Sequence, residues 1–328
     1  MLFDSFNRKI KDLRVSVTDR CNFRCFYCDP DPCTSNDPDL LTFDEIRSIC
    51  EVFVSLGIEK IRLTGGEPMV RKGLGVLIAQ LACLKPLGLQ ELAMITNGSS
   101  FANKAAELRS SGLNRITFSL DSLKPGTFRS ITGSDKLSDV LDSIEAARSA
   151  GYPNIKVNAV IIRGRNDDEI VDLARFARRN SLTVRFIEFM PLDSGHIWDR
   201  KHLVSAAEIR EKINSAFPII LINTSRRGET AWRYRFADGT GGEIGLIAPV
   251  TNAFCGDCSR IRLTADGYIR TCLFSSEEYD VRGLLRSGGS RTEVADLIRF
   301  AVARKTFGHT IGSPTFEYSS RSMSSIGG

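Results

Sequence analysis

Three cysteines near the start of the chain have a spacing that suits iron–sulfur chemistry. Cys21, Cys25 and Cys28 stand within the run TDRCNFRCFYCDP, separated by three and then two residues. Their thiolates can hold three of the four irons of a [4Fe–4S] cube, which leaves one iron without a protein ligand. Because an open coordination position distinguishes a reactive metal centre from a structural one, the motif predicts a reactive cluster.

Two other structures fit the same spacing. The three cysteines could belong to a zinc knuckle, for which Cys33 is a possible fourth ligand, or to a disulfide cluster, and spacing alone does not decide between them. The aromatic pair Phe26 and Tyr27 between the second and third cysteines favours the iron–sulfur cluster.

A second group of cysteines lies late in the chain. Two residues separate Cys255 from Cys258, and thirteen separate Cys258 from Cys272. A two-residue hairpin loop at 266–267 would place Ile261 opposite Cys272 and return the third thiol close to the other two. The sequence therefore predicts a second site with three thiolates.

Zinc is the alternative at this second site, because zinc ribbons also bind through a CxxC pair on a hairpin. The missing fourth cysteine argues against a closed zinc site. Arg260 and Arg262 are two residues apart, so both project from the same face of one strand. They predict recognition of an anion beside the cluster, although a solvated strand face would show the same pattern.

Composition describes an ordinary globular chain of one large or about two smaller domains. The 328 residues are 42% hydrophobic and 25% charged, and the net charge of +5 is too small to indicate a nucleic-acid partner. No apolar run is long enough for a bilayer, and no signal peptide is recognisable. The nine cysteines are odd in number and clustered. This pattern favours metal ligation in the reducing cytoplasm. Cys50 and Cys83 fall on apolar helix faces and are expected in the core.

The elements that would position these residues alternate between strand and helix. Helix-period segments include 43–57, where Thr42 and Glu45 form a capping box. Alternation of this kind predicts a parallel sheet flanked by helices, either open or curled into a barrel. The six expected strands are 13–18, 60–64, 91–96, 114–120, 155–162 and 182–189.

Polar and glycine-rich groups follow these strands at their carboxyl ends, where ligands collect in parallel sheets. Each group alone is typical of an ordinary turn, but together they predict a site on one rim. They are Thr64 to Pro68, Thr96 to Gly98, Ser119 with Asp121, and Glu188 with Met190.

The pattern changes near residue 225. Residues 1–225 are expected to form the barrel domain, and residues 226–328 a smaller α+β domain of short strands followed by helices near 277–286 and 290–306. The Ser-rich end, from 319 onward, is expected to be mobile.

The chain resembles the radical SAM (S-adenosylmethionine) enzymes in its first cysteine loop, in Tyr27 and in the GGEP turn at 65–68. Within that superfamily it resembles the GTP 3′,8-cyclases of molybdenum-cofactor biosynthesis. The added features are the run CGDCSRIRLTADGYIRTCLFS, the SLD sequence of the fourth strand and the terminal GlyGly. This resemblance implies an incomplete (β/α)6 TIM-type barrel with a smaller C-terminal α+β domain that carries a second cluster.

The resemblance also implies a role for each matching residue. Two [4Fe–4S] clusters would be held, the first by Cys21, Cys25 and Cys28 and the second by Cys255, Cys258 and Cys272. SAM would contact Tyr27, Gly66, Ser119 and Met190. GTP would contact Arg14, Arg62, Thr96, Lys156, Arg260 and Arg262. Arg260 and Arg262, with the terminal Gly327 and Gly328, would assist the reaction, although terminal glycines are more often a frayed end.

The implied activity is that of a cytoplasmic lyase. It would convert GTP to (8S)-3′,8-cyclo-7,8-dihydroguanosine 5′-triphosphate, the first step of molybdenum-cofactor biosynthesis. The implied partners are a flavodoxin- or ferredoxin-type electron donor and the downstream cyclic pyranopterin monophosphate synthase. No nucleic acid or membrane partner is expected, and the protein would be a monomer or a homodimer.

Two positions depart from the family pattern: Asp29 follows the first cysteine loop, and the stretch from His309 to Gly312 is less polar than expected. Two alternative functions stay open. One is a peptide-modifying radical SAM enzyme with an auxiliary cluster, although such enzymes usually carry more C-terminal cysteines. The other is a non-catalytic iron–sulfur or zinc protein.

Overall fold

The computed structural model describes residues 1–28, 39–192, 196–223, 228–314, 316–319 and 321–327. Its centre is a run of six parallel strands, each hydrogen-bonded to the next in chain order. All six strands expected from the sequence are confirmed, two with the expected bounds and four with ends shifted by one or two residues. They are β1 (Asp12–Ser16), β2 (Lys60–Thr64), β3 (Glu91–Thr96), β4 (Arg115–Ser119), β5 (Lys156–Ile161) and β6 (Thr183–Glu188).

Strands from the later part of the chain extend this run at both ends. β10 (Arg260–Leu263) pairs parallel with β1, and β9 (Glu243–Ile247) pairs parallel with β6. Beyond β10, antiparallel pairing adds β11 (Tyr268–Arg270) and then β12 (Tyr279–Asp280). Beyond β9, antiparallel pairing adds β8 (Trp232–Phe236) and then β7 (Ile219–Leu221).

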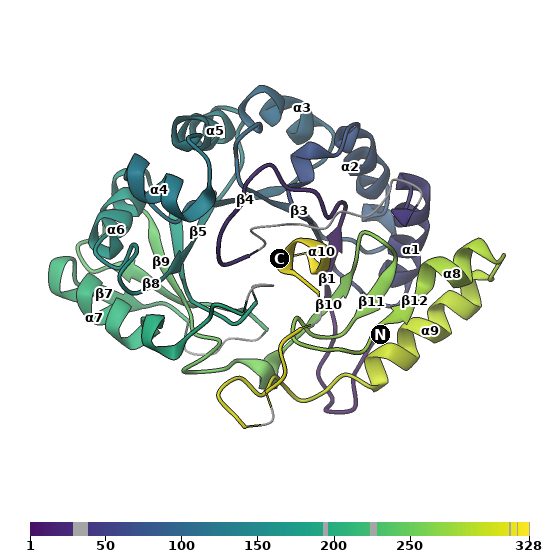
Figure 1. The fold of residues 1–328 in the computed structure, drawn as a ribbon. Coiled ribbons are helices and arrows are strands. Elements are labelled where there is room, and N and C mark those ends of the chain that lie inside the picture. Colours follow the sequence, from purple (N-terminus) through teal and green to yellow (C-terminus); the bar gives the residue numbers. More distant parts are fainter. Residues whose placement is uncertain (29–38, 193–195, 224–227, 315, 320, 328) are drawn as a thin grey trace.

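The strands curl around a central space without closing. Figure 1 shows them around the middle of the molecule with helices on the outside. Among the described strands, none joins β9 to β10, so the barrel stays open on that side. The expected incomplete TIM-type barrel is confirmed. The outer helices are α1 (Phe43–Ser55), α2 (Leu74–Ala82), α3 (Ala105–Ser110), α4 (Pro125–Thr132), α5 (Leu137–Ser149), α6 (Ile170–Arg179) and α7 (Ala206–Ala216).

Local sequence explains why the first helix forms and which way it faces. The Thr42 side chain accepts a hydrogen bond from the backbone of Glu45, whose carboxylate binds the Thr42 backbone in return, and this is the expected capping box. Ile46, Ile49 and Phe53 recur at helical spacing and are buried against the sheet. The apolar face therefore fixes α1 on the outside of the barrel.

The last part of the chain adds α8 (Val281–Arg286), α9 (Arg291–Ala303) and the short α10 (Met323–Ile326). Because β8 to β12 continue the central sheet, residues after 225 share hydrogen bonds with the barrel. The division at residue 225 stays a prediction. The expectation of a mobile end stays a prediction. Ile326 is buried, and α10 lies in the middle of the ring of strands (Figure 1).

The hairpin that carries the second cysteine group has a different register from the expected one. Arg262 lies opposite Arg270, which is one residue away from the expected pairing. The cause is a three-residue loop instead of a two-residue loop, with Thr264 donating from its backbone to Tyr268. Gly267 closes that loop in the left-handed region, at a φ of +86°, which glycine adopts without strain.

Two of the described cysteines lie outside the two cysteine groups, and they differ in environment. Cys50 is fully buried, as expected, but the expectation for Cys83 is wrong. Cys83 is exposed because it caps the end of α2, where its thiol donates to the carbonyl of Ala79. Within the described ranges, no helix is both long and apolar enough to cross a membrane.

Candidate active site

A cavity of about 320 Å³ opens at the carboxyl ends of the parallel strands, and it is large enough for a small-molecule ligand. Both cysteine groups contribute to its wall. The cysteines that line it are Cys21, Cys25, Cys28, Cys255, Cys258 and Cys272. The structure thus brings together two motifs that are more than two hundred residues apart in sequence.

The first cysteine loop follows β1 and is held from two sides. The backbone of Cys28 donates to the carbonyl of Cys25 at 3.0 Å, which closes a tight turn. Phe23 is buried and packs edge-on against Phe128 of α4, with ring centres 5.9 Å apart. These contacts fix the loop while its three thiols face the cavity.

The GGEP turn lies flat against the start of this loop. The backbone of Glu67 donates to the carbonyl of Arg20 at 2.8 Å. A Cβ atom at Gly66 would lie only 2.2 Å from the same carbonyl oxygen, so only glycine permits this approach. The turn after β2 and the loop after β1 are therefore one packed unit.

The thiols of the first loop fit a cluster better than a single ion. Among the described residues, no three Cys, His, Asp or Glu side chains converge closely enough to hold one metal ion. A cube does not require that convergence, because each thiolate binds a different iron. Cys33 lies outside the described residues. Burial raises the pKa of Cys25 well above its ordinary value, so metal binding there would have to displace the thiol proton.

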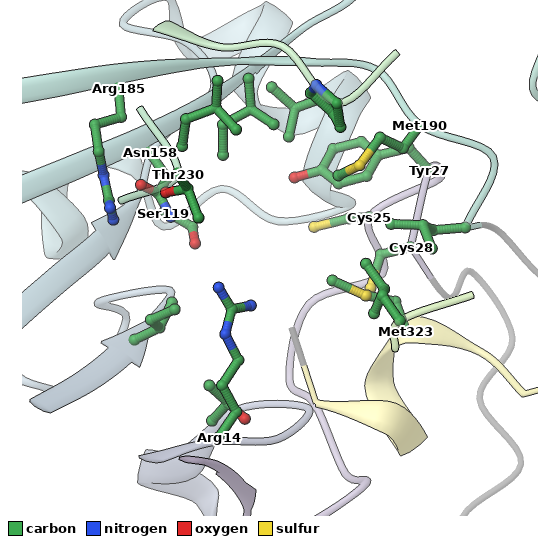
Figure 2. Close-up of a pocket in the computed structure, with 18 of the residues that line it drawn as sticks. Arg14, Cys25, Tyr27, Cys28, Ser119, Asn158, Arg185, Met190, Thr230 and Met323 are labelled. Atoms are coloured by element: carbon green, nitrogen blue, oxygen red, sulfur yellow. The ribbon is translucent and has the colours of Figure 1, made fainter. Parts of the chain in front are cut away.

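The residues expected to contact SAM line the same part of the cavity. Figure 2 shows Tyr27 and Met190 beside Cys25 and Cys28, with Ser119 on an adjoining wall. The Tyr27 hydroxyl donates to the Asp121 carboxylate at 2.6 Å, and the backbone of Val160 donates to the same carboxylate at 2.8 Å. Burial raises the pKa of Asp121 to about 6. Asp121 thus ties Tyr27 to the ends of β4 and β5.

Thr96 faces the cavity, but its hydroxyl is already used within the protein. It donates to the Glu67 carboxylate at 2.7 Å, and Glu67 also accepts from the backbones of Asn97 and Met69. Burial raises the pKa of Glu67. These bonds join the rim after β3 to the rim after β2.

The second cysteine loop places a thiol beside an arginine. The Arg260 guanidinium donates to the sulfur of Cys258 at 3.3 Å and lies over the Phe254 ring. Burial raises the pKa of the Cys258 thiol, but the positive charges of Arg260 and Lys305 outweigh burial and bring the pKa down to about 6. Cys258 is thus a thiolate at neutral pH, which is the form that binds iron.

Three arginines stand side by side across neighbouring strands. Arg14 on β1 is in register with Arg62 on β2 and with Arg262 on β10, and all three line the cavity. Burial, followed by the charges of Arg262 and Arg62, lowers the pKa of Arg14 well below its ordinary value. The buried Nε of Arg14 has no hydrogen-bond partner. Like charges this close are stabilised by an anion between them, so the row suits a polyphosphate.

Lys156 is the one described residue of the expected GTP contacts that does not line the cavity. It lies on β5, and burial, then the charges of Arg185 and Arg115, lowers its pKa to about 7. Arg185 itself does line the cavity, and sequence reasoning missed it. It is buried on β6 with an unpartnered Nε. An arginine in the middle of a mostly apolar strand, LTVRFIEF, was the signal that could have identified it.

The end of the chain enters the cavity region. The Arg262 guanidinium donates to the carbonyl of Gly327, whose φ of +84° favours glycine. A Cβ atom there would lie 2.7 Å from the Thr64 hydroxyl and 2.8 Å from Ser16. Gly328 and Asp29 lie outside the described residues, and His309 of the less polar stretch lines the cavity.

Two family models match the chain. Residues 15–177 match the Radical SAM superfamily, and residues 182–311 match the model described as Molybdenum Cofactor Synthesis C. The first match contains the first cysteine loop, and the second contains Cys255, Cys258 and Cys272.

Curated relatives are similar over the whole chain. A protein of Streptomyces coelicolor named GTP 3′,8-cyclase is 43% identical, with 100% of this chain and 96% of the relative covered. A protein of the same name from Rhodopirellula baltica is also 43% identical, covering 100% and 92%.

Solved structures show the same fold at low sequence identity. SuiB of Streptococcus suis, in a crystal structure bound to S-adenosylmethionine, has a TM-score of 0.64 and 13% identity, covering 95% of this chain and 77% of that one. The enzyme anSMEcpe with bound AdoMet has a TM-score of 0.58 and 12% identity, covering 90% and 81%.

Proposed function

The chain belongs to the GTP 3′,8-cyclases of the radical SAM superfamily, and from this premise we propose which residues carry each part of the reaction. It is a lyase of molybdenum-cofactor biosynthesis that converts GTP to (8S)-3′,8-cyclo-7,8-dihydroguanosine 5′-triphosphate with an iron–sulfur cluster and SAM. When bound, the cluster and SAM together supply the 5′-deoxyadenosyl radical that removes the hydrogen at C3′ of GTP. The carbon radical at C3′ would then form a bond to C8 of guanine, and one electron from the electron donor together with one proton would complete the 7,8-dihydro product.

The first loop and its neighbours would hold the cluster and SAM. Cys21, Cys25 and Cys28 would each bind one iron and leave the fourth iron facing the cavity. Around that opening, Tyr27, Gly66, Ser119 and Met190 would contact SAM. Support comes from the packing of Gly66 against Arg20 and from the bond between Tyr27 and Asp121, which fix this wall before SAM binds.

A second cluster would be held by Cys255, Cys258 and Cys272. The three thiols line the same cavity as the first loop. The low pKa of Cys258 and its contact with Arg260 support metal ligation there. With three protein ligands for four irons, this cluster also has a vacant position, which would face the guanine of GTP.

The row of Arg62, Arg14 and Arg262 is the observation that carries GTP binding. Three guanidiniums in register, one with an unpartnered Nε, offer paired donors for a triphosphate of about four negative charges. Arg260 would join them beside the second cluster. Lys156 would act on the phosphates from β5. We add Arg185, which lies on the next strand, β6, and lines the cavity.

Thr96 is also proposed to contact GTP, through its hydroxyl oxygen. Its hydroxyl hydrogen is committed to Glu67, but the oxygen can still accept from a ribose hydroxyl or an amino group. The same hydrogen bond holds the Glu67 side chain in place, and Glu67 forms part of the cavity wall.

Arg260, Arg262, Gly327 and Gly328 would assist catalysis. Arg262 holds the end of the chain against Thr64 and Ser16, at the side where GTP would lie. The tail would exclude water from the carbon radical and place its own backbone groups next to the substrate.

The test is anaerobic incubation of the reconstituted enzyme with SAM, dithionite and GTP, followed by mass spectrometry. We expect 5′-deoxyadenosine together with a cyclised nucleotide, and neither product from Cys25→Ala. Cleavage of SAM with GTP left unchanged, combined with turnover of a peptide, would favour a peptide-modifying enzyme instead.

The electron donor and the next enzyme are also part of this proposal. A flavodoxin- or ferredoxin-type protein would reduce the first cluster, and cyclic pyranopterin monophosphate synthase would take up the product. The free thiols of all described cysteines are consistent with the cytoplasmic location proposed here.

A further inference from the structure

A buried lysine lies beside the second cysteine group and has no role in the reaction described so far. Lys305 follows α9 and is only 3% exposed. Its ammonium donates a hydrogen bond to the carbonyl oxygen of Thr271, the residue before Cys272. The same ammonium and Arg260 are the two cationic side chains that act on the sulfur of Cys258. Lys305 is therefore bonded to the residue that precedes Cys272, and its charge acts on the sulfur of Cys258.

In the described part of the chain, no carboxylate neutralises this charge. Among the described residues, no carboxylate lies within 4.0 Å of the Lys305 ammonium, and its hydrogen bond goes to a neutral carbonyl. An ammonium without a carboxylate partner is costly to bury. A nearby group with negative charge would offset that cost.

Arg8 is a second buried cation near these cysteines, but unlike Lys305 it has a carboxylate partner. Arg8 donates to the carbonyl of Cys255 at 2.6 Å and to the carbonyls of Thr306 and Phe307, so it also holds the cluster loops. Arg8, however, is paired with the buried carboxylate of Asp4 at 2.6 Å, which leaves the pair without net charge. Both cations position the loops, but only Lys305 brings a net positive charge.

We propose that Lys305 is the counter-charge of the second cluster, fixing the Cys272 loop and raising the reduction potential of that cluster. A [4Fe–4S] cluster with three thiolate ligands carries about one negative charge when oxidised and about two when reduced. A fixed positive charge nearby stabilises the reduced state more than the oxidised state, so reduction becomes easier. This inference rests on the second cluster of the proposed function, and it assigns Lys305 as a positioning residue.

The test measures the midpoint potential of the second cluster alone. In protein carrying Cys21→Ala, Cys25→Ala and Cys28→Ala, one cluster remains, and its reduced form is followed by EPR during a redox titration. We expect Lys305→Met and Lys305→Gln to shift the midpoint to lower potential. Lys305→Arg keeps the charge and should keep the potential close to that of the parent.

A matched control separates charge from loop positioning. The double variant Asp4→Asn with Arg8→Met loosens the Cys255 loop but changes no net charge, so its midpoint should stay near that of the parent. Equal potentials for Lys305→Gln and Lys305→Arg would overturn the role of the charge. If the parent itself binds no cluster and the native chain holds about four irons instead of about eight, the second cluster is disproved and the inference falls with it.

Discussion

The guanidinium of Arg262 donates a hydrogen bond to the carbonyl oxygen of Gly327, which joins strand β10 to the end of the chain inside the barrel. The bond makes the position of the tail depend on a residue that also lines the cavity. The two residues should therefore be tested together.

Replacing Gly327 with alanine should displace the tail. The new Cβ would lie 2.7 Å from the Thr64 hydroxyl, and the φ of +84° would be strained. We expect formation of the cyclised nucleotide to fall by about tenfold or more, with SAM binding little changed. Gly288→Ala is the control, because Gly288 has a φ of +85° with nothing within 4 Å. Equal activity in both variants would mean that the tail is not needed in this position.

Removing one cysteine from each group should separate two activities. We expect Cys25→Ala to lose about four irons and all SAM cleavage, because the loop can no longer complete its cluster. Cys255→Ala should also lose about four irons but keep some SAM cleavage while losing GTP cyclisation. Iron analysis and deoxyadenosine assays measure both effects, and full iron content in Cys255→Ala would contradict the assignment.

GTP binding should be coupled to protonation of Lys156. Burial, then Arg185 and Arg115, lowers the pKa of Lys156 to about 7, so at pH 8 the side chain is mostly neutral in the free protein. A bound triphosphate favours its charged form. We expect proton uptake on binding at pH 8 and weaker binding as the pH rises above about 7. Calorimetry in two buffers of different ionisation enthalpy detects the proton, and Lys156→Met should abolish it.

The same group makes the stability of the free protein depend on pH. The folded-state pKa of Lys156 lies near 7, below its ordinary value of 10.5, so between these values the unfolded chain binds more protons. The free energy of unfolding should therefore rise with pH across this window. In Lys156→Met, the contribution of this lysine to the rise of the unfolding free energy with pH should disappear. Urea denaturation at several pH values measures it. An unchanged slope would show that the lysine is not buried as described.

Gly66→Ala should damage the first loop without removing any of the three cysteines proposed to bind its cluster. The added Cβ would lie 2.2 Å from the carbonyl oxygen of Arg20, which is backbone and cannot move aside cheaply. We expect a lower melting temperature and weaker SAM binding, measured by calorimetry. Gly126→Ala, where nothing lies within 4 Å, should leave both unchanged. Normal SAM affinity in Gly66→Ala would show that the turn can withdraw from the loop.

Local patterns were sufficient to predict the strands and the two cysteine groups. β-Branched runs marked β1 to β6, and the thiol spacing by itself identified residues that line one cavity. What failed depended on the exact length of one loop and one helix. The hairpin register changed because Gly267 closes a three-residue loop, and Cys83 is exposed because α2 ends just before it.

The pairings that complete the site were not visible in the sequence. Nothing local indicates that β10 lies beside β1 or β9 beside β6, because such pairing depends on the whole barrel. For the same reason, the row of Arg62, Arg14 and Arg262 was predicted only as separate residues. Arg185 was missed because a single arginine on a strand carries no motif.

The pairing of β1 with β10 also sets an order for synthesis. β1 and the first cysteine loop leave the ribosome early, but one edge of β1 has no partner until residues 260–263 emerge. Throughout that interval β1, the strand that leads into the first cysteine loop, is an edge strand of the sheet. Residues 321–327 lie inside the ring of strands and come after both β1 and β10 in the chain, so β1 and β10 can pair before the central space is filled.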